Sequence, residues 1–428
     1  MTKLLALTTL SVASLGVAAL AIAHNDDDND DWPEHSSKAL TLAVYGDAPY
    51  GCKAPTAAGA SDECPPNSIY RADDPNLPNP GDPRQIEATP AFIDAVNRDR
   101  KVELVIHVGD IHSGAQFCTV AYNRTILNLW SRFDDPLVYT PGDNEWADCQ
   151  KAKEGGGVTN AAGEYVDYAA GNPVANLALV RQMFFPEPGR TLGEHRKRVT
   201  SQAQAFDPAF PADGEYVENV MWEQSQVLFV TINVPGGSNN DNDTWNTAAF
   251  GSAFGATGNT KSATQLQDMT QRTAADLRWL DAAFARAKAH GAKAVVIVDQ
   301  ADMWDLDGTL PADNHLAKYE PVIAKMAAQA QAFGKPVLLF NGDSHRYRSD
   351  NPLKQGQPCV VESGADSVGC GDDDWATHPN YDVSNFHRVV VHGSVFPLEY
   401  LRLSIDTRAN RAASATSFGP FSWERVIP

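Results

Sequence analysis

Short apolar runs alternate along this chain with segments in which apolar residues recur at helical spacing. Residues 102–108, 227–234 and 294–298 are short runs rich in β-branched side chains and bounded by turn residues, which is typical of buried strands. Residues 273–290 and 320–333 carry apolar side chains on one helical face, and a glycine that can end a helix follows each segment. This alternation predicts an α/β fold built of layers.

Local signals predict three further elements. Thr89 and Pro90 are predicted to begin a helix that continues through Val96, because threonine is a good N-cap and proline fits the first helical position. Residues 388–395 and 398–405 have the composition of strands, and we expect them to pair with each other.

Three segments are expected to lie outside this regular framework. Residues 55–84 and about 150–213 are crowded with Pro, Gly, Asp and Asn and are predicted to be loop-rich insertions, although a helical pattern covers residues 174–185. Residues 406–428 are predicted to form a C-terminal tail of mostly small residues on the surface of the domain.

The amino terminus has the form of a secretory signal peptide. Lys3 precedes an almost wholly apolar stretch that ends in Ala21-Ile22-Ala23, so residues 1–23 are expected to be cleaved on export. The alternative is a membrane anchor, but the acidic linker of residues 24–38 follows directly. We expect an exported protein, periplasmic or secreted and without stable membrane association, with one domain over residues 39–405.

The chain is strongly acidic, with 54 Asp and Glu against 34 Lys and Arg and a formal net charge of −20. Nucleic acids and anionic membrane surfaces require a basic surface, so neither is an expected partner. An anionic substrate would need local cations, which points to bound metal ions.

Six cysteines in a chain expected to be exported indicate disulfide bonds. Their order and spacing favour the pairs Cys52–Cys64, Cys118–Cys149 and Cys359–Cys370, although sequence alone permits other pairings. Zinc ligation is the alternative, but the chain contains no Cys-x-x-Cys pair.

Five strand-like runs end in a carboxylate or an amide beside a turn. The residues at these ends are Asp47, Asp110, Asp143, Asp299 with Gln300, and Asp343 with His345 close behind. In open α/β sheets, ligands bind outside the carboxyl ends of the strands. Acidic side chains gathered at one edge repel each other unless cations lie among them, so this pattern predicts a metal-dependent hydrolase.

In this order, the motifs resemble those of the calcineurin-like metallophosphoesterase superfamily, whose members carry D-x-H, G-D, G-N-H-[DE], a strand-end histidine and G-H-x-H. The segment Thr-Pro-Gly-Asp-Asn-Glu-Trp, with Cys149 after it, is similar to an exported bacterial branch of that superfamily. The resemblance covers about residues 40–405. It implies packed β-sheets flanked by helices, with two divalent metal ions at the strand ends.

The resemblance assigns roles position by position. Asp47 matches the first metal ligand, but Pro49 stands where the family has a histidine. Asp110 matches the carboxylate that bridges the two metals. Asp143 takes the place of the family's asparagine ligand, and Asn144 replaces the histidine often assigned to proton transfer.

The last two motifs also depart from the family. Gln300 stands where the strand-end histidine would be, with Asp299 as a substitute, and Asp343 replaces the first histidine of G-H-x-H. One metal site is expected to contain Asp47, Asp110 and His345, and the other Asp110, Asp143, Asp343 and Gln300. Oxygen donors favour Mn²⁺, Mg²⁺ or Ca²⁺ at the second site, whereas zinc or iron would suit the imidazole of the first.

Four residues that are not among the expected metal ligands are also interpreted. His112 follows Asp110 by two positions and is either the missing imidazole, as ligand or catalytic proton donor, or a loop histidine bonded to a carboxylate. His107 and His392 are expected to be core histidines. Glu145 is expected either to support the metal site or to accept hydrogen bonds from backbone amides.

Two segments are candidates for contact with substrate. Residues 236–241 follow a predicted strand, so their amides would reach the same edge unless the segment is a plain turn. Residues 190–198 contain a basic cluster, which is either a solvated face or a phosphate clamp, formed by Arg190, Arg196, Lys197 and Arg198.

The sequence therefore predicts an exported, metal-dependent phosphoric ester hydrolase in which a metal-held hydroxide attacks phosphorus of a small-molecule ester. The alternative is a non-catalytic binding or structural domain of the same fold, stabilised by calcium. The departures that favour this alternative are Pro49, Asn144, Gln300 and Asp343.

Overall fold

The computed structural model describes residues 39–51 and 83–428, except for residues 115, 161, 242–243, 246–259, 305–314, 364–365 and 371–380. The predicted signal peptide, the acidic linker, most of the insertion at 55–84 and the Cys52–Cys64 pair lie outside the described residues.

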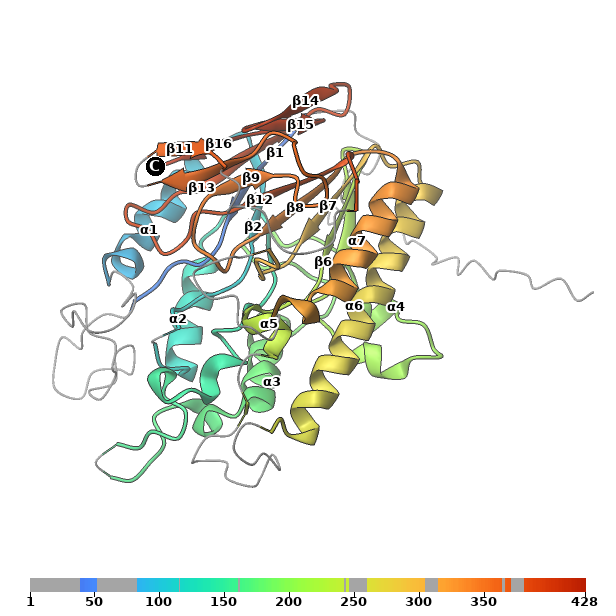
Figure 1. The fold of residues 1–428 in the computed structure, drawn as a ribbon. Helices are drawn as coiled ribbons and strands as arrows, with labels where there is room; N and C mark the ends of the chain where they lie inside the picture. The colour runs from blue at the N-terminus through green and yellow to red at the C-terminus, as the bar shows by residue number, and fades with distance from the viewer. Residues whose placement is uncertain are drawn as a thin grey trace, which may run out of the picture.

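Two mixed β-sheets lie face to face (Figure 1). The strands of the first sheet are β1 (Leu40–Tyr45), β2 (Val102–His107), β3 (Leu137–Tyr139), β13 (Tyr400–Ile405), β14 (Arg411–Ser414), β15 (Ser417–Gly419) and β16 (Phe421–Val426). Their order across the sheet is β14-β15-β16-β13-β1-β2-β3. β1, β2 and β3 are parallel, so their carboxyl ends meet at one edge.

The second sheet has the order β11-β10-β9-β12-β8-β7-β6-β5-β4. Its strands are β4 (Thr200–Ser201), β5 (Val220–Gln224), β6 (Val227–Thr231), β7 (Ala294–Val298), β8 (Val337–Asn341), β9 (Arg348–Asp350), β10 (Val360–Ser363), β11 (Asp366–Gly369) and β12 (Phe386–Val390). β6, β7, β8 and β12 are parallel and form the centre of this sheet.

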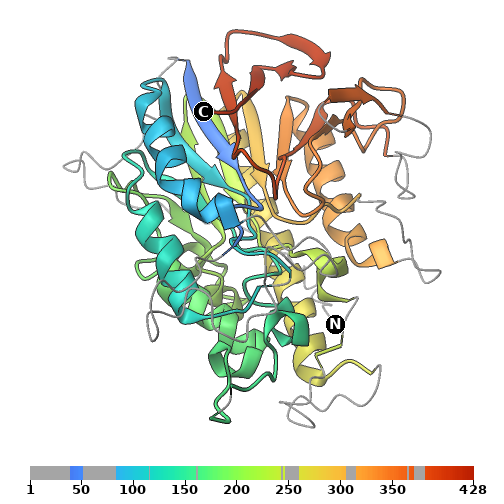
Figure 2. The ribbon, with the colours of Figure 1, turned by 90° about the vertical axis from the view of Figure 1, so that its left-hand side faces the viewer.

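Helices cover the outer face of each sheet. The first sheet is covered by α1 (Pro83–Arg98), α2 (Val120–Trp130) and α3 (Pro173–Phe184), and the second by α6 (Ala263–Ala289) and α7 (Glu320–Phe333). In Figure 2, the blue α1 and the orange α7 lie on opposite sides of the strands. The predicted α/β fold of packed sheets flanked by helices is confirmed.

Short helices lie in the connections. They are α4 (Gln202–Ala205), α5 (Gly236–Asn240) and the 3-10 helices η1 (Asp148–Gln150), η2 (Ala152–Glu154), η3 (Tyr168–Gly171), η4 (Pro211–Glu215) and η6 (His315–Lys318). The predicted insertion at 150–213 contains several of them, and it also supplies α3 and the edge strand β4.

The alternation of side chains along the central strands builds the layers. In β7, Val295 and Ile297 pack against α6 and α7, whereas Val296 and Val298 pack into the core between the two sheets. This period of two continues past the strand and sends Asp299 and Gln300 to opposite sides. Only the side that faces the first sheet leads to the carboxylates of β1 and β2.

Helix ends agree with the sequence where Gly or Ser marks them. α7 has the predicted bounds, and Gly334 follows it with φ +69°. α6 ends as predicted but begins ten residues earlier than predicted, at Ala263 after the N-cap Ser262. Its first turns bury polar side chains, so the apolar pattern that marks the rest of the helix does not extend to its start. α1 likewise begins before Thr89, whose hydroxyl donates to the carbonyl of Gln85 instead of capping the helix.

Two predictions about the carboxyl-terminal part of the chain are wrong. β12 and β13 do not pair, because the segment between them crosses from the second sheet to the first. The predicted tail is also a sheet element, since β16 pairs with β13 along the whole register from Tyr400–Val426 to Ile405–Phe421. Phe421 and Trp423 alternate with polar residues and enter the core between the sheets.

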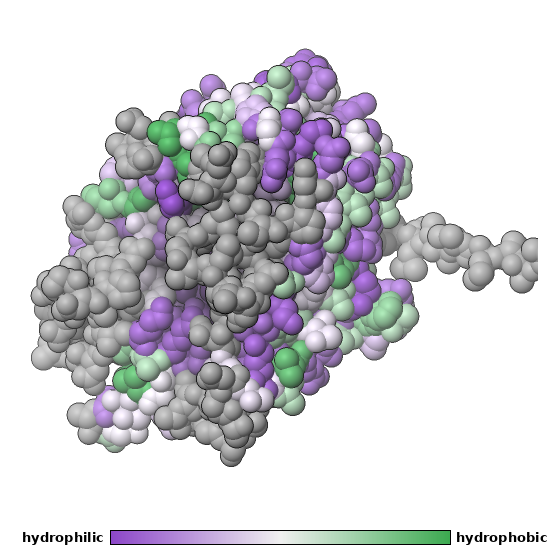
Figure 3. Space-filling view, in the orientation of Figure 1, coloured by the Kyte–Doolittle hydropathy of each residue, from purple (hydrophilic) through white to green (hydrophobic). Residues whose placement is uncertain are grey.

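The described residues contain two disulfides, Cys118–Cys149 and Cys359–Cys370, and both were predicted. Within the described part of the chain, no helix combines the length and the apolar character needed to cross a bilayer. Among the coloured residues of Figure 3, hydrophobic side chains form small separate spots rather than one broad patch.

Candidate metal centre

The predicted acidic residues converge at the carboxyl ends of parallel strands from both sheets. Asp47, Asp110 and Asp143 follow β1, β2 and β3, and Asp343 follows β8. Ligand atoms of Asp47, Asp110 and His345 lie within 4.8 Å of one another, and so do those of Asp110, Asp143 and Asp343. We call these the first and second acidic groups, and they share Asp110.

The backbone at these residues adopts an uncommon conformation. The φ angles of Asp47, Asp110, Asp343 and His345 are +47°, +55°, +76° and +62°. Residues other than glycine rarely adopt the left-handed region, although Asp tolerates it better than most. Such strain is typical of functional sites, where the surrounding structure fixes it. Here the amide of Asp343 donates to Asp47 Oδ1 (3.0 Å), so the two sheets hold each other's turns.

In two of the four Gly-Asp pairs at these strand ends, the glycine is required because another acidic side chain packs against it. Gly142 precedes Asp143 but packs against the carboxylate of Asp110, and Gly342 precedes Asp343 but packs against that of Asp47. A Cβ atom at either glycine would collide with the carboxylate. Each glycine therefore makes room for an acidic side chain from a neighbouring strand.

Gln300 organises the second acidic group through hydrogen bonds. Its Oε1 accepts from the amide of Gly236 (2.7 Å), and a backbone amide can only donate, which fixes the orientation of the side chain. Its Nε2 then donates to Asp110 Oδ2 (3.0 Å) and Asp143 Oδ1 (3.2 Å). The expectation that Gln300 is a metal ligand is corrected by this arrangement, because its oxygen points away from the carboxylates.

The chemistry of the two groups fits divalent cations. Asp47 is fully buried, and its Oδ2 atom has no hydrogen-bond partner among the described residues. Burial, and next the charge of Asp143, raises the pKa of Asp110 well above its usual value. Burial also raises the pKa of Asp143 to about 7. Buried carboxylates this close need either protons or cations, and the donor sets are those that divalent metals accept.

This crowding predicts that chelator-treated protein loses stability as pH rises from about 4 to 7. Asp143 has a folded-state pKa of about 7 against its usual 3.8, so in this window the folded state holds a proton that the unfolded chain has released. Urea unfolding at a series of pH values would measure the slope. Asp143→Asn should make this fall shallower, because the variant cannot hold that proton, and a slope that the substitution leaves unchanged would contradict the assignment.

Tyr50 is a site residue that the sequence analysis did not assign. Its hydroxyl lies 3.1 Å from Nε2 of His345, and that nitrogen lies 3.5 Å from Asp47 Oδ1. Burial lowers the pKa of His345 to about 4, so the ring is neutral and can offer a lone pair. The Asp-Ala-Pro-Tyr sequence carries no signal for this contact, because the turn after β1 decides where Tyr50 points.

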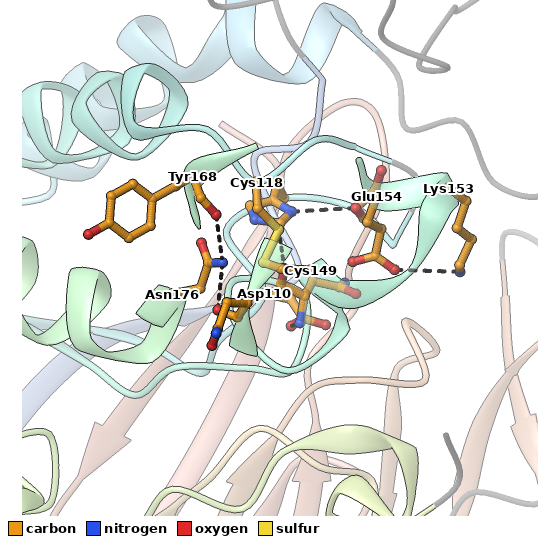
Figure 4. The surroundings of a disulfide bond; sticks show 11 residues. Asp110, Cys118, Cys149, Lys153, Glu154, Tyr168 and Asn176 are labelled. Carbon is orange, nitrogen blue, oxygen red and sulfur yellow. Dashed lines mark hydrogen bonds and ion pairs between the residues drawn. A yellow bond between two sulfur atoms is a disulfide. The ribbon is translucent and has the colours of Figure 1, made fainter. Parts of the chain in front are cut away.

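The Cys118–Cys149 disulfide lies next to Asp110 (Figure 4), and Asn144 contacts both. The amide of Asn144 donates to Asp110 Oδ1 (3.3 Å), and its carbonyl oxygen lies 3.4 Å from Cys118 Sγ. The disulfide therefore ties down the turn that follows β3.

His112 does not join either acidic group. Its ring is fully buried beside the disulfide, and a ring nitrogen lies within 4.8 Å of both sulfurs. Burial lowers the pKa of His112 to about 4, and its Nε2 has no hydrogen-bond partner among the described residues. The structure therefore places it neither as a replacement imidazole among the carboxylates nor on a carboxylate. The side chain turns away because Asp110 is left-handed.

The other three residues interpreted from the sequence, Glu145, His107 and His392, have different surroundings. Glu145 Oε1 accepts from the amide of Gly142 (2.9 Å) and from the Tyr139 hydroxyl, as a backbone-capping residue would. His107 is a buried core histidine that contacts the carbonyl of Ala48 (2.7 Å). His392 is instead half-buried and paired with Glu362 and Glu399.

Asp299 is not a substitute ligand. It is fully buried on the helix side of β7, and neither carboxylate oxygen has a hydrogen-bond partner among the described residues. The basic cluster also stays apart from the acids, since Leu192 pairs with Leu137 at the start of β3 and not at its carboxyl end. The loop at 236–241 does reach the site. A Cβ on Gly236 would lie 2.7 Å from both Asp143 Oδ2 and Asp343 Oδ1.

No protein-family model and no curated protein matches the sequence. Among solved structures, the fold is similar to a dimetal phosphatase from Danio rerio, with 12% identity and a TM-score of 0.36, over 91% of this chain and 98% of that one. It is also similar to the purple acid phosphatase PPD1 from yellow lupin (Lupinus luteus) seeds, with 11% identity and a TM-score of 0.33. That match covers 88% of this chain and 53% of the lupin chain.

Proposed function

We propose that this chain is a metal-dependent phosphoric ester hydrolase that holds two divalent cations. The observation that carries the proposal is the shared carboxylate of Asp110, which belongs to both acidic groups. Asp47 and His345 would hold one ion with Asp110, and Asp143 and Asp343 the other. Bound cations would lower the pKa of a water molecule and offset negative charge on a phosphoryl group.

The chain's own residues would prepare this site. Gln300 and the amide of Asn144 orient Asp110, and the glycines of the Gly-Asp pairs let the carboxylates approach. The oxygen-only second group favours Mn²⁺, Mg²⁺ or Ca²⁺, whereas the imidazole of the first group also suits zinc or iron. The substrate would be a small phosphate ester, and the two disulfides, together with the features of residues 1–23, support export.

The site favours substrates that need no proton donor. Asn144 stands at the position where the resemblance implies an imidazole, and His112 is buried and neutral beside the disulfide. General acid catalysis is worth roughly 10²–10⁴-fold. We therefore expect kcat/KM for aryl phosphates with good leaving groups to exceed that for alkyl phosphates by about that factor.

The test is to strip the protein of metal, add back Mn²⁺, Mg²⁺, Ca²⁺ or Zn²⁺ singly, and assay aryl and alkyl mono- and diesters. Asp110→Asn is the negative control. Activity that returns with metal and is absent in the variant supports the hydrolase. Equal rates on both leaving groups would mean that another residue supplies the proton.

The oxygen-only donor set of the second group also favours a second candidate, a non-catalytic domain stabilised by calcium. The same experiment separates the two. Metal that raises the melting temperature without turnover of any ester supports the binding domain and overturns the hydrolase.

A further inference from the structure

The loop after β6 lies directly against the second acidic group. Gly236 packs on the carboxylates of Asp143 and Asp343, and its amide holds Gln300, which in turn holds Asp110 and Asp143. The position of this loop, labelled α5, therefore decides how closely these carboxylates can approach one ion.

This loop has a backbone that needs outside support. Gly237, Ser238, Asn239 and Asn240 have φ angles of +59°, +58°, +58° and +68°, which makes a left-handed turn. Left-handed helical backbone is unfavourable for each residue that has a Cβ, because the Cβ comes too close to the following carbonyl oxygen. The turn persists because neighbouring groups hold it, among them the Tyr319 hydroxyl, which donates to the carbonyl of Pro235 (3.3 Å), and several side chains of α6.

Arg272 of α6 supports this turn from a fully buried position. Its Nη1 donates to Asn239 Oδ1 and to the carbonyl of Asn233 (3.2 Å), and its Nη2 donates to the carbonyl of Asn239 (3.4 Å). Nη2 also pairs with Asp268 one turn earlier on the helix (3.1 Å). Two more residues of α6 contact the turn: Gln265 Nε2 donates to the Asn240 carbonyl (2.9 Å), and Thr273 Oγ1 accepts from Asn239 Nδ2 (2.9 Å).

The same guanidinium reaches the turn that carries Asp143. Its central carbon lies 5.4 Å from the centre of the Trp146 ring, and the amide of Trp146 donates to the carbonyl of Asp143 (3.2 Å). Arg272 therefore touches both loops that flank the second acidic group. None of these contacts reaches Asp47 or His345 of the first group.

We propose that Arg272 is a positioning residue for the second metal site, where it holds the 236–240 turn and the Asp143 turn at the spacing that one cation requires. Buried charge is a poor way to gain stability alone, since apolar replacements are often as stable. The planar guanidinium holds its donors in a fixed arrangement and contacts two loops at once, so it fixes the position of one loop relative to the other. A lysine cannot reproduce this. The inference rests on the proposed function only in that the second group binds metal.

The test compares Arg272→Lys with Arg278→Lys, a matched change on the same helix at a half-exposed arginine that pairs with Asp213. Chelator-treated proteins are titrated with Mn²⁺ by calorimetry, without substrate. We expect Arg272→Lys to keep the affinity of the first ion and to weaken the second by about 10–100-fold, as loss of a supporting group around a metal ligand does. Arg278→Lys should bind both ions as the wild type does.

A second variant covers failure of Arg272→Lys to fold. Asn239→Gly suits a positive φ and removes one acceptor of Arg272, the side-chain Oδ1, so it should weaken the second ion selectively as well. Equal weakening of both ions, together with a lower melting temperature, or no weakening in either variant, overturns the inference. Wild type that binds two ions but turns over no ester leaves it standing and overturns only the hydrolase, whereas wild type that binds no ion overturns both.

Discussion

Asp110→Asn is expected to remove both metal ions and to abolish activity, because Asp110 belongs to both acidic groups. Each ion stabilises charge in the transition state by several kcal/mol, so the loss in kcat/KM should be about 10³-fold or more. Calorimetric titration and a phosphatase assay on the same sample would measure both effects. Asp281→Asn is the matched control, since Asp281 lies on the surface of α6 and pairs with Lys325.

In the metal-free protein, the same substitution is expected to raise the melting temperature. Burial, with the neighbouring carboxylates Asp143, Glu145 and Asp47, raises the pKa of Asp110. A neutral amide removes that repulsion, so chelator-treated Asp110→Asn should melt at a higher temperature than chelator-treated wild type at pH 8. A variant that is less stable without metal and still active with it would contradict the shared carboxylate.

Arg388→Met is expected to lower the free energy of unfolding by about 3–5 kcal/mol, which is the usual cost of leaving buried charges without their partner. Arg388 is fully buried in β12, donates from Nε and Nη2 to Asp350 (2.9 and 2.8 Å), and pairs through Nη1 with Asp302. Burial alone would raise the pKa of Asp350, but Arg388 and Arg348 lower it overall. Without Arg388, buried Asp302 loses the arginine that pairs with it, and buried Asp350 keeps only Arg348.

Urea unfolding would measure this loss, with Arg408→Met as control because Arg408 pairs with Asp406 on the surface. The effect should extend to the metal centre. The amide of Asp302 donates to Asp343 Oδ2 (3.1 Å), so displacement of Asp302 should also weaken the second ion. A change in unfolding free energy no larger than that of the control would show that the buried ion pairs of Arg388 do not stabilise the fold.

The strand-end acids could be predicted because two local signals mark them. An apolar β-branched run predicts a parallel strand, and a Gly-Asp pair after it predicts a turn that delivers a carboxylate. Asp47, Asp110, Asp143 and Asp343 all lie where those signals place them. The carboxyl-terminal strands had a signal too, the alternation of Phe421 and Trp423 with polar residues, but the small residues before it suggested a tail.

What the sequence could not supply is side-chain direction. The sequence does not say whether the oxygen or the nitrogen of the Gln300 side chain faces Asp110. The backbone N–H of Gly236 decides this, because it donates to the oxygen and so leaves the nitrogen facing Asp110. His112 follows Asp110 closely, yet Asp110 itself is left-handed and the His112 ring lies beside the disulfide instead of among the carboxylates. Arg272 carries no motif, because its role depends on loops that are distant in the chain.

Each acidic group takes residues from both sheets. Asp47 and Asp343 are joined by a hydrogen bond across 296 positions of sequence, so an ion here closes one of the longest loops of the chain. Such a loop closes only after the chain has been made as far as Asp343, about four fifths of its 428 residues, and the two sheets have met. If the chain crosses a membrane unfolded, its metal is acquired outside the cytoplasm. The choice of ion then follows the metal supply where the sheets come together, as well as the preferences of the ligands.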